Sequence, residues 1–255
     1  MVARLLVLAL LLLLPGQGAA REEVVLGLSE DRISINTSFT GSQILIYGAV
    51  KREAPPEDAP LGVIITVEGP DQRLTVRRKT RQFGIWINTD AVVVDSAPSF
   101  YAVATTGPLE DILTSTEDLR RKISINRAIR AVGAPDTIRD AERFTEAIIR
   151  IRERANLYQQ REGRVDLRQE TLFSTAISMP SELVEGVYDV RIFLTRKGEV
   201  ISEHDSSIDV RKVGLERWLF ALAHARPFFY GLMSLAVAIL AGWGASEAFR
   251  KLRNW

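Results

Sequence analysis

Hydrophobic and polar residues are arranged differently in successive parts of this chain. Leu5–Leu14 is an unbroken apolar run, and Pro227–Ser246 is a second block without a charged residue. Between them, short stretches with apolar residues at every second position flank a segment in which they recur at every third or fourth. These periods are typical of strands and of helices, so the pattern predicts two apolar ends around a β–α–β body.

The first apolar run has the organisation of a secretory signal peptide. Arg4 provides the basic lead, Pro15 ends the apolar core, and Gly18–Ala20 supplies the small residues that a signal peptidase requires. We therefore expect residues 1–20 to be removed after Ala20. An uncleaved N-terminal anchor is the alternative, but the run is shorter than the ~20 residues that cross a bilayer.

The second apolar block predicts a transmembrane helix over residues 227–248. At ~1.5 Å per residue, its ~20 uncharged residues extend ~30 Å, which matches the hydrocarbon core of a membrane. A juxtamembrane segment, 213–226, precedes it, and a basic cytoplasmic tail, 249–255, follows it. Because the signal peptide starts export and this helix stops it, we expect a single-pass protein with its body outside the cytoplasm.

Residues 21–107 contain several short runs with strand character. In one of them Val63, Ile65 and Val67 fall on the same face. The runs are Val24–Leu28, Arg32–Asn36, Gln43–Val50, Gly62–Glu68, Arg73–Lys79, Phe83–Asn88, Ala91–Asp95 and Phe100–Thr105. The proline-rich residues 54–60 cannot join a strand ladder and predict a loop.

Residues 108–162 have helical spacing. The clearest helix starts near Asp136, and its apolar residues form one stripe opposite a charged face. The stripe consists of Ala141, Phe144, Ile148, Ile151, Ala155 and Tyr158. We expect this helix to cover the sheet of its own domain, and a short coiled-coil seam with a partner is the alternative.

Strand character returns in residues 163–212. The sequence around Tyr188 resembles the late strands of immunoglobulin-like domains, where a tyrosine begins a strand near a corner. We therefore predict a mainly β fold: an immunoglobulin-like or similar antiparallel β-sandwich with a helical insertion and a single C-terminal transmembrane helix. The second β-rich region either completes the first sandwich or forms a second small sheet.

Composition restricts the chemistry of the body. The 33 basic residues nearly balance the 32 acidic ones, which argues against nucleic-acid binding, and there is no cysteine for a disulfide or thiolate site. On a regular strand His204 points away from Glu203 and Asp205, so we expect no metal site there; His224 lies next to the membrane segment. No nucleophile elbow or phosphate-binding loop occurs, and we predict no catalytic site and no cofactor.

Two groups of residues are candidates for an interaction surface. One is basic and has no acidic residue between positions 119 and 135, which suits anionic lipid or an acidic partner. The other is aromatic, a residue type favoured at interfaces. A solvated helix face and core packing, respectively, are the alternatives. The candidate residues are Trp86, Phe100, Tyr101, Arg120, Arg121 and Lys122.

Small residues recur at every fourth position of the membrane segment, namely Ser234, Ala238, Gly242 and Ser246. An α-helix drifts only ~40° over such a step, so the row stays near one side. Small side chains allow a second helix to approach closely in lipid. The row predicts packing against a second copy or a membrane protein partner, and chance recurrence is the alternative.

Three segments, Gly84–Asn88, Ala97–Ala104 and Val210–Glu216, carry a family resemblance. Together with the order of signal peptide, β region, helices, β region and single span, they resemble an alphaproteobacterial family of uncharacterised transmembrane proteins. The resemblance covers nearly the whole mature chain. It implies an inner (plasma) membrane protein with a periplasmic domain and brings no catalytic residues. A loose association of the family with sulfite-exporter-type permeases suggests a membrane partner.

These expectations favour a membrane-anchored periplasmic binding or scaffolding protein, with an accessory role beside a membrane permease as one form of it. A membrane-tethered, hydrolase-like enzyme with an unrecognised site is the alternative. Convergent acids with shifted pKa values in a cleft would favour the enzyme. An exposed aromatic patch on the domain or on its helices would favour the binding protein.

Overall fold

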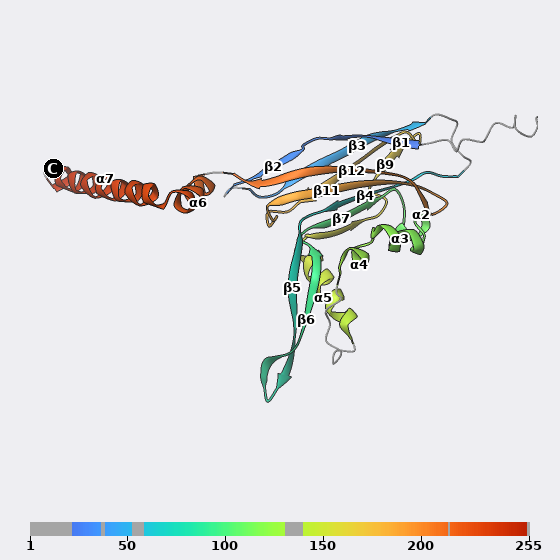
Figure 1. Cartoon of the computed structure of the whole chain (residues 1–255), viewed down its shortest axis with the longest axis horizontal. Coiled ribbons are helices and arrows are strands. Elements are labelled where there is room, and N and C mark those ends of the chain that lie inside the picture. Colours follow the sequence, from blue (N-terminus) through green and yellow to red (C-terminus); the bar gives the residue numbers. More distant parts are fainter. Residues whose placement is uncertain (1–21, 37–38, 53–58, 131–139, 214, 254–255) are drawn as a thin grey trace, which may run out of the picture.

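The computed structural model describes residues 22–36, 39–52, 59–130, 140–213 and 215–253 (Figure 1). The signal peptide predicted over residues 1–20 lies outside this range, as does the helix start predicted near Asp136. Both therefore stay predictions.

Two β-sheets form the body. One has four strands in the order β1-β3-β10-β9, and the other has six in the order β2-β12-β11-β4-β7-β8. Paired strands are antiparallel, except that β12 runs parallel to β2 and β7 parallel to β8. The strands are β1 (Glu22–Leu28), β2 (Arg32–Ile35), β3 (Ser42–Arg52), β4 (Gly62–Glu68), β7 (Tyr101–Thr105), β8 (Tyr158–Arg161), β9 (Asp166–Arg168), β10 (Leu172–Met179), β11 (Gly186–Arg196) and β12 (Glu199–Lys212).

Strands from before and after the helices are mixed in both sheets. β10 pairs with β3, and β11 lies between β12 and β4. The second β region therefore completes the first sandwich, and the helices are an insertion into it. The predicted mainly β fold with a helical segment is confirmed.

The main core lies between the two sheets. Val63, Ile65 and Val67 of β4 point into it, as the alternation in the sequence predicts, and Tyr188 of β11 is fully buried there. The Tyr188 hydroxyl donates a 2.9 Å hydrogen bond to the carbonyl of Val184. The sequence around Tyr188 resembles a strand that begins near a corner, and this bond back to a nearby loop is the contact that a tyrosine corner makes.

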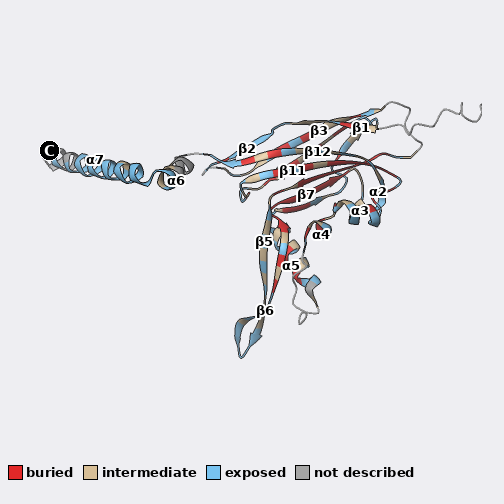
Figure 2. Cartoon of the chain, in the orientation of Figure 1, coloured by how far each residue is buried: buried red, intermediate tan, exposed pale blue. Residues whose placement is uncertain are grey.

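A helical layer covers the outer face of the six-stranded sheet (Figures 1 and 2). Its helices are α2 (Leu109–Ile112), α3 (Ser115–Arg121), α4 (Ile125–Ala128) and α5 (Ala141–Arg154). Ile64 of β4 and Phe193 of β11 face this layer and pack with Ile123, Ile125 and Ile148. β4 is consequently buried on both sides, and the expectation that the helices cover their own sheet is confirmed.

The stripe predicted for α5 is correct only in part. Phe144 and Ile148 are buried, but Ile151 is 60% exposed. The helix ends at Arg154, because Asn156 takes a left-handed conformation (φ 55°) and turns the chain into β8. Tyr158 belongs to that strand, where it is buried beside β7 rather than on the helix.

A two-stranded hairpin projects away from the sandwich (Figure 1). It consists of β5 (Asp71–Gln82) and β6 (Ile85–Pro98), and we call it the arm. The sequence predicts separate runs at Phe83–Asn88 and Ala91–Asp95, which is wrong: β6 is a single strand. A shift in register places Asn88 opposite Lys79 and Asp90 opposite Arg78, so Thr89 is accommodated as an extra residue in the strand.

Two helices follow β12. α6 (Leu215–Ala225) contacts α7 (Pro227–Arg253), which extends away from the sandwich (Figure 1). Pro227–Ser246 is long and apolar enough to cross a membrane, and none of it is buried inside the protein. Exposure of such a helix to water would be costly, which agrees with the transmembrane segment predicted over these residues.

Candidate interaction surface on the projecting arm

The base of the arm is fixed to α5. Leu74, Val76 and Val94 on one face of the hairpin pack with the helical layer. Beyond them, the Arg78 guanidinium donates to Asp90 of β6 at 2.8–2.9 Å and to Asp140, just before α5, at 2.5 Å. These contacts hold the proximal half of the arm at a defined angle to the body.

The Arg78 contacts also shift a pKa. Hydrogen bonds from Arg78 hold the pKa of the Asp140 carboxyl below its usual range. The Arg78 guanidinium additionally lies over the Phe144 ring, 5.1 Å from the centroid. The ion pair with Asp140 and the cation–π contact with Phe144 both favour the charged form of Arg78. Arg78 therefore links the two strands of the arm to the start of α5.

The turn at the end of the arm is locally strained. Gln82 pairs with Ile85, which leaves a two-residue loop in which Phe83 and Gly84 both have positive φ, 50° and 87°. This is the type I′ geometry of tight hairpins, whose first position favours asparagine, aspartate or glycine. A bulky aromatic residue with positive φ costs ~1 kcal/mol or more.

The strained residue is also fully exposed. The exposed fraction of Phe83 is 105%, and those of Ile85 and Trp86 are 65% and 67%. A β-carbon added at Gly84 would meet nothing within 4 Å. Three large apolar side chains therefore surround a turn in open solvent, where they do not contribute to the core.

One face of the arm is basic. Arg73, Arg77, Lys79 and Arg81 occupy alternate positions of β5 and are all exposed, opposite to the face that packs on α5. Trp86 lies directly across from Arg81, so it shares this face. No ion pair is recorded for these four cations among the residues that the structure describes.

The structure separates the three aromatic candidates from the sequence. Trp86 is exposed at the end of the arm, whereas Phe100 and Tyr101 are both 0% exposed. Phe100 packs between the sheets, and the Tyr101 hydroxyl donates to the carbonyl of Ile123 beneath the helices at 2.9 Å. As interaction-surface residues Phe100 and Tyr101 were wrongly assigned: they fill the two cores.

The basic cluster is largely neutralised inside the molecule. Arg120 pairs with Glu117 one turn earlier, at 2.6 Å, and Arg121 pairs with Glu117 and with Glu203 of β12. Lys122 follows with φ 54° and ends α3. Residues 119–135 contain no acid, but Glu117 before this stretch and Glu203 after it compensate the charges of Arg120 and Arg121.

Lys122 lines a cleft of about 650 Å³ at the base of the arm, together with Glu68, Asp71, Arg127, Arg130 and Arg191. Burial raises the pKa of the Glu68 carboxyl, and the nearby Arg191 guanidinium, at 3.5 Å, partly offsets the effect. Arg191 is itself held by the carbonyl of Arg121 at 2.9 Å. Glu68 and Arg191 thus form a partly buried ion pair, and the negative charge of Asp71, the second acid of the cleft, contributes to raising the Glu68 pKa.

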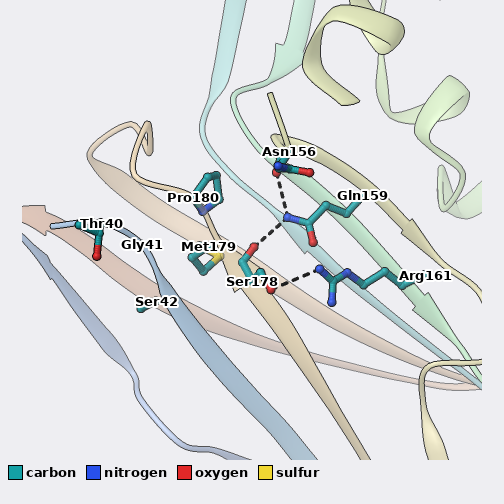
Figure 3. A pocket seen from close by; sticks show the side chains of 9 residues that line it. All are labelled: Thr40, Gly41, Ser42, Asn156, Gln159, Arg161, Ser178, Met179 and Pro180. Atoms are coloured by element: carbon teal, nitrogen blue, oxygen red, sulfur yellow. Dashed lines mark hydrogen bonds between the residues drawn. The ribbon is translucent and has the colours of Figure 1, made fainter. Parts of the chain in front are cut away.

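A smaller crevice of about 410 Å³ lies where the two sheets approach without pairing (Figure 3). The Gln159 amide of β8 donates to the carbonyls of Asn156 and Ser178, at 2.9 and 2.8 Å. The Arg161 guanidinium reaches the Ser178 hydroxyl at 3.3 Å. These side chains bridge β8 and β10, so the crevice is a polar closure of the sandwich edge.

Both histidines lie in the described part of the chain, outside any group of potential metal ligands found there. Within the described ranges no group of three or more His, Cys, Asp or Glu side chains is placed to hold a metal ion. His204 lies on β12 with the same parity as the buried Ile208 and Val210. It is partly buried at the edge of the core, as the strand pattern predicts.

A family model described as Putative transmembrane protein (Alph_Pro_TM) matches residues 23–251. This chain belongs to the Alph_Pro_TM family. A comparison with curated proteins finds no match. The match includes both the arm and α7, so both belong to the part of the chain that the Alph_Pro_TM family shares.

In this Alph_Pro_TM protein the small residues of the span remain uncovered. Ser234, Ala238, Gly242 and Ser246 are all exposed on α7. They lie in the candidate span, and the single chain places no other element against them among the described residues. The row is thus accessible to another helix in the membrane.

Sequence reasoning missed Phe83, Ile85 and the basic face of β5. The signals are present: Phe-Gly stands between two alternating runs, and the charges of β5 fall on every second position. Both features predict a hairpin with one solvated face. Neither feature predicts that the end of the hairpin projects beyond the sandwich, because that depends on which strands α5 contacts.

Proposed function

We propose that this protein is a membrane-anchored binding or scaffolding protein whose sandwich and arm lie in the periplasm and contact a partner at the inner membrane. α7 is the anchor. The observation that carries the proposal is the end of the arm, where a strained and fully exposed Phe83 stands beside exposed Ile85 and Trp86. These side chains would be removed from water, which lowers the free energy, only if something outside the chain covers them.

The periplasmic location is supported by the signal peptide predicted over residues 1–20, the stop-transfer character of Pro227–Ser246 and the basic tail. A phosphatase reporter fused after Trp255 should be inactive, and the same reporter fused after Lys212 should be active. Activity of the fusion after Trp255 would show that the C-terminus lies outside the cytoplasm and would contradict the proposed topology.

Binding is tested by asking which part of the chain retains a partner. Full-length protein is purified from solubilised membranes, in parallel with a version in which α7 is replaced by an unrelated transmembrane helix. We expect the same membrane protein to co-purify with both, because the periplasmic body makes the contact. Loss of all co-purifying proteins with the replaced helix would show that α7 alone binds.

The exposed row on α7 supports a second contact with that partner or with another copy. Gly242→Leu places a bulky side chain where close helix packing requires a small one, so association within the membrane should weaken while insertion is retained. Leu235→Val on the same helix is the control. Unchanged energy transfer between labelled copies, and unchanged partner recovery, would leave α7 as a plain anchor.

A further inference from the structure

The outer part of the arm is a free-standing ribbon. Lys79 to Asn88 lie beyond the Arg78 contacts that fix the hairpin to α5, and we call this segment the arm tip. A two-stranded ribbon without a third strand or a covering helix is only marginally stable in water. The arm tip is therefore a part of the fold whose sequence is little constrained by the core.

The residue types at the turn of the arm tip are unfavourable for the backbone conformation of that turn. Phe83 has φ 50° at a position that favours asparagine or glycine, and its side chain makes no use of the core. Strain at an exposed aromatic residue points to a role outside the chain. The exposed Ile85 and Trp86 point to opposite faces of the ribbon and extend the apolar surface on both sides of the turn.

The charge beside this apolar surface specifies the occupant further. Arg77, Lys79 and Arg81 lie on one exposed face, which Trp86 shares because it lies across from Arg81. The acidic Asp90 is engaged by Arg78 on the other face. An apolar centre with a one-sided basic border fits a surface that presents the complement, an apolar socket bordered by carboxylates.

Two other occupants fit the arm tip less well. A second copy meeting it tip to tip would bring like charges together, since both copies would present Arg77, Lys79 and Arg81. An anionic bilayer suits the residue types, but the arm and α7 extend from the sandwich in different directions (Figure 1). The arm tip therefore does not point the same way as the helix that crosses the membrane.

We propose that the arm tip inserts Phe83, Ile85 and Trp86 into an apolar socket bordered by carboxylates on the periplasmic face of a neighbouring protein in the same membrane. This inference rests on the proposed binding function and adds the chemistry of the partner. The aromatic side chains provide the buried centre of the interface, and the basic face sets its orientation and its dependence on salt.

The test uses the full-length chain in intact membranes. Phe83 is replaced by the photoreactive benzoylphenylalanine, which keeps an aromatic side chain at the turn, and the crosslinked peptide is sequenced. We expect one protein adduct whose peptide carries acidic residues next to apolar ones. Trp86→Ala should lower its yield about tenfold or more, as removal of an interface hot spot does.

Charge reversal distinguishes binding to a specific acidic socket from crosslinking between proteins that are merely close together. The double variant Arg77→Glu/Arg81→Glu should abolish the adduct, and substituting lysine for the partner's crosslinked acids should restore it. The double variant Arg154→Glu/Arg164→Glu changes the same net charge at exposed positions outside the arm and is the matched control. It should leave the yield unchanged.

Several results would overturn the inference. These are adducts confined to lipid or to a second copy, no adduct at all, or a yield that survives reversal of Arg77 and Arg81. If the partner still co-purifies with the chain whose α7 has been replaced, the proposed binding function stands and only the role of the arm tip is lost.

Discussion

The centre of the sandwich and the end of the arm use similar residues for opposite purposes. β4 buries every position from Gly62 to Val67, because one face packs between the sheets and the other packs under the helices. The arm tip also carries aromatic and branched apolar residues, yet Phe83, Ile85 and Trp86 are exposed. Folding explains the apolar residues of β4 and does not explain those of the arm tip.

The most direct way to sharpen this comparison is to make one substitution in both places. Ile65 in β4 is 0% exposed and Ile85 is 65% exposed. Ile65→Ala should lower the free energy of unfolding by about 2–5 kcal/mol, because it removes buried methyl groups and leaves a cavity. Ile85→Ala should change it by less than ~0.5 kcal/mol. Denaturant unfolding of the full chain in detergent measures both, and equal losses would show that the Ile85 side chain is packed as tightly as that of Ile65.

A second pair of substitutions tests whether the closure at Tyr188 stabilises the body. Tyr188→Phe removes the hydrogen bond to the carbonyl of Val184 and should cost about 1–2 kcal/mol. Tyr47 is 46% exposed and its hydroxyl makes no hydrogen bond to another residue of the described ranges, so Tyr47→Phe is the matched control. If both variants unfold at the same denaturant concentration, the tyrosine corner contributes nothing.

A smaller effect is expected in the acid dependence of the body. Burial by itself would raise the pKa of Glu22, but hydrogen bonds from Arg196 and Arg52 outweigh it and hold this pKa below its usual range. A lowered carboxyl pKa stabilises the fold above the unfolded value, and the contribution is lost as the pH falls through the folded value.

The variant Glu22→Gln removes that titration. Its stability should therefore fall less between pH 5 and more acidic conditions than that of the parent chain, and it should be the less stable protein at neutral pH. Glu23→Gln alters an exposed neighbour, 4.0 Å from Lys51, and is the control. A parent-like acid profile in Glu22→Gln would show that the pairing of Glu22 with Arg52 and Arg196 is not the source of the acid dependence.

The sandwich could be predicted from the sequence because strand alternation is local information. Val63, Ile65 and Val67 mark their face by parity alone, and Tyr188 marks a corner by its position at the start of a strand. Helix coverage of the sheet follows from an apolar stripe, although its end was misplaced: Ile151 continues the helical spacing beyond the point where packing stops.

The candidate site could be predicted only in fragments. Trp86 was identified from its residue type, but so were Phe100 and Tyr101, which are buried. Residue type does not distinguish a core aromatic from an exposed one when both lie in strands. The pairing of Arg121 with Glu203 joins positions 82 residues apart, and no local pattern shows it.

The central claim is that the arm tip is kept apolar for binding and at a cost in stability. Phe83→Asn tests it in one experiment with two readings, unfolding of the full chain and recovery of the co-purifying membrane protein. Asparagine suits the positive φ of this turn, so stability should rise by up to ~1 kcal/mol while recovery falls about tenfold. Lower stability with unchanged recovery would contradict the account, because Phe83 would then serve the fold and not the partner.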